Sequence, residues 1–200
     1  MRRSGSPCKL GAAALEDGID KKASRSSGPL YFGSAAFILD PDQPGGTLTM
    51  IISMKSNLPI SPDVLWNHLK SPLTFQKVAS PLMGFKPLGG NRLPEQWSTR
   101  SYPLRMDLFK LIPLGSHTIS FLSIDDRSRV LSTDESGTII KTWRHTMAVH
   151  AGSSGTTAVF QDELHFSNGL LTWPTYIGVY LFFVYRHARM RQLIRSGRLN

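Results

Sequence analysis

Between residues 118 and 166, apolar and polar side chains alternate along segments that are separated by turn-forming residues. The expected turns are Asp126-Arg127, Ser136-Gly137 and the Gly/Ser/Thr-rich loop 151–156. Because successive side chains of a strand point to opposite faces, this alternation collects the apolar residues on one face of a sheet. The sequence therefore predicts an antiparallel meander with one buried face and one solvated face.

The turns also predict the register of this meander. One choice of cross-strand pairs places the apolar residues of all these strands on the same face. It pairs Asp125 with Ser128, Glu135 with Thr138, and His150 with Thr157. The buried face then carries Ile119, Phe121, Val130, Trp143, Met147, Val149, Phe160, Leu164 and Phe166. The solvated face collects Thr118, Ser120, Arg129, Thr133, Glu135, Thr142, Arg144, Gln161 and Glu163.

The segment before the meander predicts strands and two short helices. Residues 47–57 are rich in residues that favour a strand. Ser61-Pro62 and Ser71-Pro72 each place a capping residue before a proline at the first helical position. Residues 81–88 and 96–108 read as the next two strands.

A long helix is predicted after the last strand, beginning near Trp173-Pro174. Residues 176–185 are apolar on all sides, as expected of a helix enclosed by a concave sheet. This run is about half the length that a bilayer requires, so we expect no membrane span. The prediction is an α+β helix-grip fold: a curved antiparallel sheet of about seven strands wrapped around a long C-terminal helix, with two short helices after the first strand.

The domain organisation follows from composition. Residues 1–46 are dominated by Gly, Ser, Ala and Pro, so we expect a disordered or loosely docked N-terminal extension. Residues 47–200 form the predicted domain. The only cysteine, Cys8, cannot make an internal disulfide, which favours a reducing, cytoplasmic setting. We expect no metal and no cofactor, because no metal-ligand spacing, phosphate-binding glycine loop or redox fingerprint is present.

The net charge of +9 is concentrated at the C-terminus. Basic residues there complement the dipole of the last helix. They also permit peripheral contact with an anionic membrane or an acidic partner, through Arg186, Arg189, Arg191 and Arg195. No nucleic-acid motif is present, so we expect no nucleic-acid partner.

A polar pair on the buried face is the candidate site. The predicted register sets His145 directly opposite Asp162, within reach of an imidazole–carboxylate contact. Three interpretations stay open: a pair that only fixes the register, a ligand anchor, or a catalytic acid–base pair. His187, among the C-terminal arginines, is expected at the surface. The ligand-binding candidates are Phe121, Trp143, His145, Met147, Phe160, Asp162, Tyr180 and Phe183.

Three passages resemble the START-like superfamily, also called SRPBCC, which includes polyketide cyclase/dehydrase-like proteins. They are Ile60-Ser61-Pro62-Asp63-Val64-Leu65-Trp66, residues 137–145 leading to Asp162, and Tyr185-Arg186-His187-Ala188-Arg189-Met190-Arg191. The last two are most similar to the uncharacterised bacterial ligand-binding branch. The resemblance implies that residues 47–200 are a START-like ligand-binding domain with a cavity between sheet and helix.

The expected function is binding of an apolar or amphiphilic small molecule, lipid-like or polyketide-like, as a carrier or sensor. One alternative is a cyclase- or dehydratase-type enzyme that uses His145 and Asp162. A second alternative is a membrane-associated interaction protein that uses the basic C-terminal helix.

Overall fold

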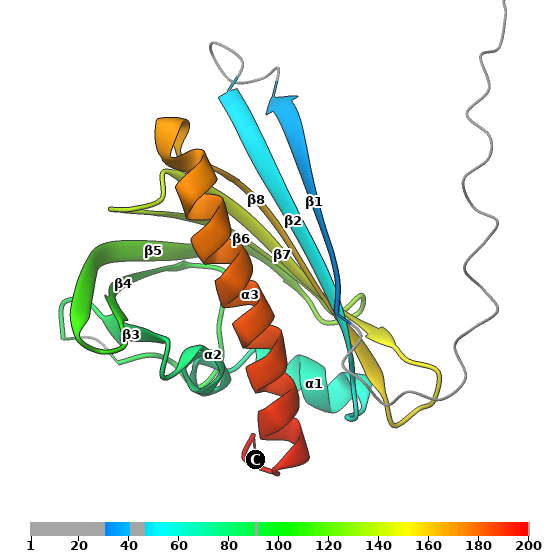
Figure 1. Ribbon diagram of the computed structural model, residues 1–200. Helices are drawn as coiled ribbons and strands as arrows, with labels where there is room; N and C mark the ends of the chain where they lie inside the picture. Colours follow the sequence, from blue (N-terminus) through cyan, green and yellow to red (C-terminus); the bar gives the residue numbers. More distant parts are fainter. Residues whose placement is uncertain (1–30, 41–46, 91, 200) are drawn as a thin grey trace, which may run out of the picture.

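A computed structural model describes residues 31–40, 47–90 and 92–199 of this chain. Within these residues, one antiparallel sheet of eight strands curves around a long helix, α3, in the order β1-β2-β8-β7-β6-β5-β4-β3 (Figure 1). The strands are β1 Tyr31–Asp40, β2 Thr47–Leu58, β3 Met83–Pro87, β4 Ser101–Leu108, β5 Ile112–Asp125, β6 Val130–Gly137, β7 Thr142–Ala151 and β8 Ala158–Ser167. The helices are α1 Pro62–Leu69, α2 Pro72–Ala79 and α3 Thr172–Arg195, with a 3₁₀ turn, Gly169–Leu171, before α3. The predicted helix-grip architecture is confirmed.

The eighth strand comes from the predicted extension. β1 pairs along its whole length with β2, from Tyr31 opposite Ser56 to Asp40 opposite Thr47. It forms the edge of the sheet, next to the strand that was expected to open the domain. The rest of the extension, residues 1–30 with Cys8 and residues 41–46, lies outside the described residues.

The two short helices begin where the sequence predicts, each with a proline in its first turn. α1 buries Leu65, Trp66 and Leu69 against the sheet. Both helices lie at the end of the sheet where α3 has its C-terminus (Figure 1). They close that end of the space between sheet and helix.

The register predicted for β5, β6 and β7 is wrong. Between Phe121 and Ser123 a bulge inserts one extra residue, so Phe121 pairs with Thr133 instead of Ser132. A one-residue shift moves every following side chain to the other face of a strand. The inward residues of β6 are therefore Leu131, Thr133 and Glu135, and not Val130.

The register between β7 and β8 differs from the prediction by two residues. Met147 lies opposite Asp162, and His145 lies opposite Leu164. An even shift preserves the faces of both strands, so His145 and Asp162 still point inward, as diagonal neighbours. Arg144 is exposed, as predicted from the alternation.

α3 is enclosed by the sheet on one side only. Its inward face buries Val179, Phe183, Met190 and Leu193. Its outward face leaves Trp173, Ile177 and Leu181 more than half exposed, so the expectation of burial all around is wrong. The reason is geometric: the sheet covers one face of the helix, and the described residues form no second layer over the other (Figure 1). Among the described helices, none has the length and hydrophobicity that crossing a bilayer demands.

Candidate functional site

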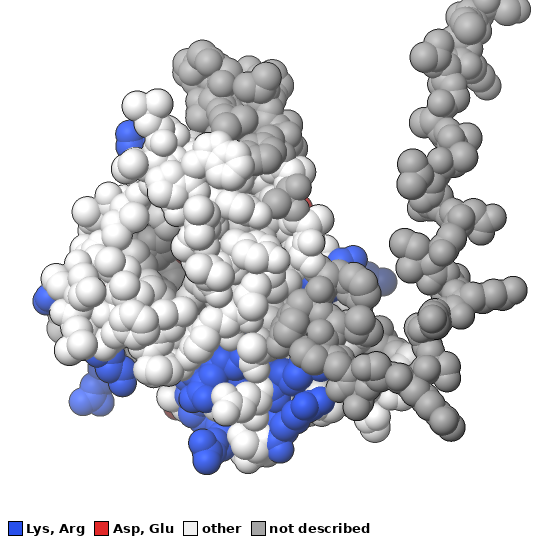
Figure 2. Space-filling model, in the orientation of Figure 1, with Lys and Arg blue, Asp and Glu red and all other residues white. Residues whose placement is uncertain are grey.

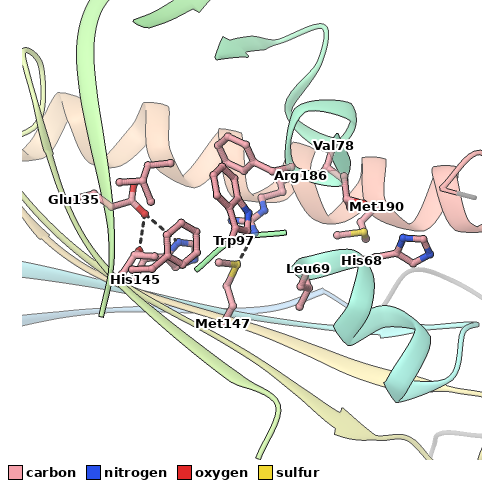
Figure 3. A pocket seen from close by; sticks show the side chains of 14 residues that line it. His68, Leu69, Val78, Trp97, Glu135, His145, Met147, Arg186 and Met190 are labelled. Atoms are coloured by element: carbon pink, nitrogen blue, oxygen red, sulfur yellow. Dashed lines mark hydrogen bonds and ion pairs between the residues drawn. The ribbon is translucent and has the colours of Figure 1, made fainter. Parts of the chain in front are cut away.

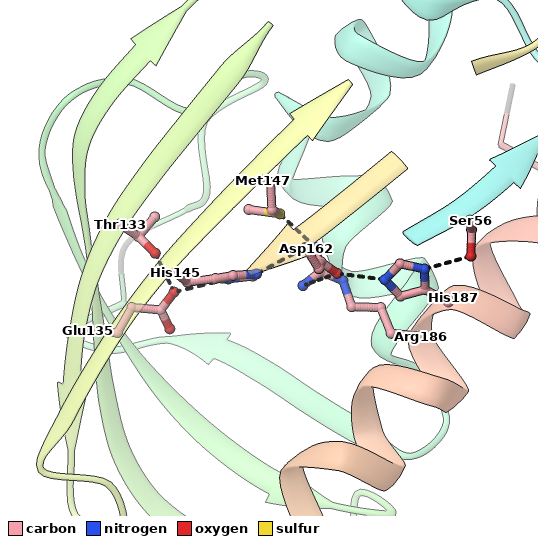
Figure 4. A network of polar contacts seen from close by, with 8 residues as sticks. All are labelled: Ser56, Thr133, Glu135, His145, Met147, Asp162, Arg186 and His187. Carbon is pink, nitrogen blue, oxygen red and sulfur yellow. Dashed lines mark hydrogen bonds and ion pairs between the residues drawn. The ribbon is translucent and has the colours of Figure 1, made fainter. Parts of the chain in front are cut away.

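A chain of polar side chains crosses the interior between β6 and α3 (Figure 4). Its centre is Asp162 of β8, whose side chain is completely buried. Asp162 Oδ1 accepts a hydrogen bond from His145 Nε2 at 3.0 Å, and Oδ2 accepts one from His187 Nε2 at 3.0 Å. A guanidinium nitrogen of Arg186 lies 3.5 Å from Oδ2. The predicted His145–Asp162 contact is therefore present, within a larger group.

On the side of α3, this series of polar side chains ends at β2. In the tautomer in which His187 donates through Nε2 to Asp162, Nδ1 is an acceptor. Ser56 Oγ lies 2.7 Å from this Nδ1 and donates to it. Residues from β2, β8 and α3 are thus tied together by hydrogen bonds that solvent does not reach.

In the opposite direction, the series of polar side chains continues to β6. His145 Nδ1 lies 3.9 Å from Glu135 Oε1, which also accepts a hydrogen bond from Thr133 Oγ1 at 2.6 Å. Glu135 Oε2 accepts one from Nε2 of His117, on β5, at 2.7 Å. Glu135 is buried at 8% exposure, because the bulge in β5 turns it inward.

Arg186 and His187 correct the prediction of a solvated C-terminal helix. His187 is fully buried, and Arg186 is 8% exposed. The Arg186 guanidinium lies over the rings of Phe160 and Phe183, with Nη2 2.8 Å from Met147 Sδ. Arg186 is therefore not available to an outside partner, in contrast to the prediction.

The positions of Arg186 and His187 follow the helical repeat. They continue the inward positions Val179 and Phe183 by one further turn, towards Met190. This spacing is visible in the sequence, but the density of arginines around it points to a solvated face instead. The periodicity, rather than the composition, predicts burial here.

The electrostatics of the group follow from burial and contact. Burial opposes ionisation of Glu135, yet the hydrogen bonds with His117 and His145 outweigh it and lower its pKa to about 2. Burial also opposes ionisation of Asp162, and the Arg186 charge with the hydrogen bonds from His145 and His187 holds its pKa well below the usual range. Both carboxyls are therefore ionised at neutral pH.

His145 lies between these two carboxylates. Burial favours its neutral form, but the contacts with Asp162 and Glu135 raise its pKa above the ordinary value. Each ring nitrogen faces a carboxylate oxygen, an arrangement that matches a doubly protonated ring with two donors. In this state His145 is a proton donor and not a general base.

Two cavities meet at this polar group. The larger, about 290 Å³, lies between α3 and the strands β3–β7, and Figure 2 shows the surface hollowed beside α3. Its apolar lining consists mainly of Phe75, Met83, Phe85, Met106, Leu108, Leu114, Ile119, Ile139, Ile140, Val179, Phe182 and Phe183. Its polar lining includes His117, Glu135, His145 and Arg186.

The smaller cavity, about 40 Å³, extends from the same group towards α1 and α2. Figure 3 shows Glu135 and His145 at one end of it, and Leu69, Val78 and Met190 towards the other. The two cavities share five wall residues: Phe75, Ile119, Glu135, His145 and Arg186. A charged, hydrogen-bonded partition therefore separates two apolar compartments.

The predicted site residues fall into three sets. Trp143, His145 and Phe183 line the larger cavity. Phe121 and Met147 line the smaller one, together with His145. Asp162, Phe160 and Tyr180 line neither cavity: Asp162 and Phe160 lie fully buried behind the wall, and Tyr180 is a partly buried residue of the cluster around Phe166 and Phe183.

Glu135, Thr133 and His117 also belong to the wall or to the network, although the sequence pattern does not predict it. The simple alternation of faces assigned the first two to solvent. Only the bulge beside Phe121 reverses that assignment, and bulges leave a weak signal in a single sequence. Among the described residues, no cluster of three or more His, Cys, Asp and Glu side chains is arranged to hold a metal ion.

Residues 56–194 match the family described as Domain of unknown function (DUF8410). No curated protein matches the sequence.

Solved structures with the same helix-grip fold include several at low identity. Zhui aromatase/cyclase from Streptomyces sp. R1128 is 9% identical, with a TM-score of 0.57 over 74% of this chain and 94% of that one. Ara h 8.0201 is 11% identical, with a TM-score of 0.55 over 74% and 99%. Protein CV1439 from Chromobacterium violaceum is 14% identical, with a TM-score of 0.54 over 72% and 96%. These likenesses confirm the START-like fold expected from the sequence.

Proposed function

We propose that this chain, which belongs to the DUF8410 family, binds an apolar or amphiphilic small molecule in the cavity between α3 and β3–β7. The observation that carries the proposal is the larger cavity, with apolar walls and a few polar groups gathered at its inner end. Small-molecule sites have this composition, because apolar surface supplies affinity and a few polar groups fix orientation. The proposed role is that of a carrier or sensor.

The energetics support binding without a reaction. Burying about 300 Å² of apolar ligand surface contributes roughly 7 kcal/mol before the costs of association. The charged residues of the wall are paired, His145 and Arg186 with Asp162 behind the wall and Glu135 with His117, so ligand entry does not require a new counterion. An uncharged ligand suits this arrangement.

Gly178 of α3 offers a direct test. It lines the larger cavity, and a Cβ added there would meet no atom within 4 Å. A phenylalanine at this position is expected to occupy the cavity mouth without a backbone clash. The matched control is Gly178→Ala, which strengthens the helix by about 1 kcal/mol and leaves the mouth open.

The probe is the neutral fluorophore N-phenyl-1-naphthylamine, titrated into the full chain. Binding should saturate with the wild type and with Gly178→Ala, and should be lost with Gly178→Phe. Native mass spectrometry of the protein purified from its producing cells should show a bound small molecule that Gly178→Phe lacks. Equal probe binding by all three proteins would contradict the assignment of this cavity as the ligand site.

The enzymatic alternative rests on His145, which lines both cavities. A cyclase or dehydratase built on this geometry would use His145 as a proton donor, with Asp162 and Glu135 holding the donor in place. Its test is turnover of a polyketide-like substrate that is lost in His145→Gln while the circular dichroism spectrum is retained. Stoichiometric binding without product favours the carrier or sensor.

A second candidate function is supported by the outer face of α3. Trp173, Ile177 and Leu181 follow one another at helical spacing and are 56–60% exposed. At the C-terminal end of the same helix, Figure 2 shows a concentration of Lys and Arg. Arg195, the last residue of α3, and Arg198 are exposed. Apolar side chains beside basic ones are typical of a helix that lies on an anionic membrane surface.

Co-sedimentation with phosphatidylcholine vesicles, with and without phosphatidylserine, tests the membrane candidate. The wild type should bind the phosphatidylserine vesicles in a salt-sensitive manner, and Ile177→Asp should not. Val64→Asp is the control, because Val64 is exposed on α1, away from α3's outer face. No binding at low salt overturns the candidate, and concentration-dependent dimerisation lost in Ile177→Asp would show that copies of this chain cover the face.

A further inference from the structure

Two buried polar atoms in the wall of the larger cavity have no hydrogen-bond partner among the described residues. They are Nδ1 of His117 and Nε1 of Trp143. The two side chains are only 5% and 8% exposed. Because a buried polar atom without a partner is costly, native proteins rarely retain two of them at one place. Their position in a cavity wall points to a partner that arrives with the ligand.

The hydrogen-bonding role of each atom is set by its surroundings. Glu135 is ionised, so the proton of His117 lies on Nε2, which donates to Glu135 Oε2 at 2.7 Å. In this tautomer, Nδ1 of His117 is an acceptor. The indole Nε1–H of Trp143 can only donate. The wall therefore presents one acceptor and one donor.

The rings of His117 and Trp143 are neighbours in the cavity wall. Their centroids are 6.5 Å apart, and the rings meet edge-on. Gly137, the residue opposite His117 in the sheet, has no side chain, whereas a Cβ there would lie 3.0 Å from Nδ1. A side chain at this position would crowd Nδ1 and would also lie 2.5 Å from the Ser116 carbonyl oxygen, so the glycine keeps a side chain away from the acceptor nitrogen.

We propose that the ligand carries a neutral hydroxyl group, a phenol or an alcohol, on an otherwise apolar skeleton. This proposal rests on the proposed ligand-binding function. The hydroxyl donates to His117 Nδ1 and accepts from Trp143 Nε1–H. A carboxylate lacks the donor and would bring a second negative charge near Glu135. An ammonium lacks the acceptor, and an ether or ketone can satisfy only Trp143.

Three matched probes separate these cases: 2-naphthol, 2-methoxynaphthalene and 2-methylnaphthalene. The first can donate and accept, the second can only accept, and the third can do neither. Trp143→Phe removes the donor. His117→Gln keeps an amide donor for Glu135 and replaces the ring acceptor Nδ1 by an amide oxygen in a different geometry. Phe182→Leu, in the same wall, is the control that changes apolar contact alone.

The quantity to compare is the ratio of the Kd of 2-methylnaphthalene to that of 2-naphthol, because this ratio cancels general changes in the cavity. It should fall about five- to tenfold in Trp143→Phe and in His117→Gln, and stay within about twofold of wild type in Phe182→Leu. The preference for 2-methoxynaphthalene over 2-methylnaphthalene should fall in Trp143→Phe alone. In ¹H–¹⁵N spectra, 2-naphthol should shift the Trp143 indole signal downfield more than 2-methylnaphthalene does.

The two proposals fail in different ways. If all probes bind and neither polar variant changes the ratio, the hydroxyl assignment is wrong and ligand binding stands. If no probe binds the wild type, the proposed function itself is wrong. Should His117→Gln not fold, the Trp143→Phe ratio and the wild-type indole shift decide the question without it.

Discussion

His187 of α3 donates a hydrogen bond to Asp162 of β8 at 3.0 Å, and both side chains are completely inaccessible to solvent. The contact joins the long helix to the middle of the sheet at the inner end of the cavities. It is one of three contacts that converge on the same carboxylate, with His145 and Arg186 supplying the others. The stability of the helix–sheet interface and the shape of the ligand site therefore depend on a single side chain.

Asp162→Ala should destabilise the protein by about 3–5 kcal/mol, because it leaves buried cationic groups without their counterion. Chemical denaturation followed by circular dichroism measures this loss. The control is Glu163→Ala on the same strand, whose partly exposed pair with His165 is worth about 0–1 kcal/mol. Equal effects of the two substitutions would contradict the central role of Asp162.

The outer end of the buried polar network, at Ser56, should contribute less to the free energy of unfolding than Asp162 does. Ser56→Ala removes the hydroxyl that donates to His187 Nδ1 and should cost about 1 kcal/mol. Ser53→Ala, on the same strand but facing away from the helix, should be within about 0.5 kcal/mol of neutral. Denaturation midpoints of the two variants, measured side by side, check the prediction; an unchanged midpoint for Ser56→Ala would argue against the bond.

Stability should pass through a maximum in weakly acidic solution. Glu135 and Asp162 have lowered pKa values, so the stability they contribute is complete above their ordinary pKa values and is lost as the pH falls towards 2. His145 has a raised pKa, so its contribution is complete below 6.5 and is lost as the pH rises through the raised value.

Urea midpoints measured from pH 3 to pH 9 test this dependence. From about pH 5 to about pH 6.5, above the range in which the two carboxyls titrate and below the range in which His145 titrates, the free energy of unfolding should change little. In His145→Gln, the decline above pH 6.5 should disappear while the acid limb persists. A decline of the same size in that variant would assign it to another group.

The β4–β5 hairpin should gain stability from a glycine. Its turn, Leu108–Leu111, places Phe109 and Lys110 at φ values of 53° and 60°, where side chains other than Gly, Asn and Asp are strained. Lys110→Gly should raise the free energy of unfolding by about 0.5–1 kcal/mol, whereas Lys110→Ala should not. Thermal unfolding of both variants separates relief of backbone strain from loss of the lysine side chain.

β1 should contribute to stability although it lies in the compositionally unusual N-terminal segment. Deleting residues 1–44 removes a strand that pairs with β2 throughout, and deleting residues 1–30 does not. The longer deletion should unfold at a temperature lower by at least about 2–4 °C, the shift that 1 kcal/mol produces in a chain of this size. Equal midpoints for the two deletions would show that the edge strand is dispensable.

The sequence by itself determined the parts of this protein that depend on local periodicity. Alternation of apolar and polar residues defines the strands of the meander, and proline after a serine marks the start of α1 and α2. Trp143, His145 and Asp162 could be assigned to the buried face, because an even error in register leaves the face of a side chain unchanged.

Only the tertiary structure decided which polar residues meet. The bulge beside Phe121 turns Glu135 inward, and the closure of the sheet over one side of α3 buries Arg186 and His187. Both effects depend on how elements distant in sequence pack, so a charged residue that reads locally as solvated becomes part of the interior. The same packing leaves His117 Nδ1 and Trp143 Nε1 without partners among the described residues, because the shape of the cavity, and not the local sequence, determines which atoms can reach them.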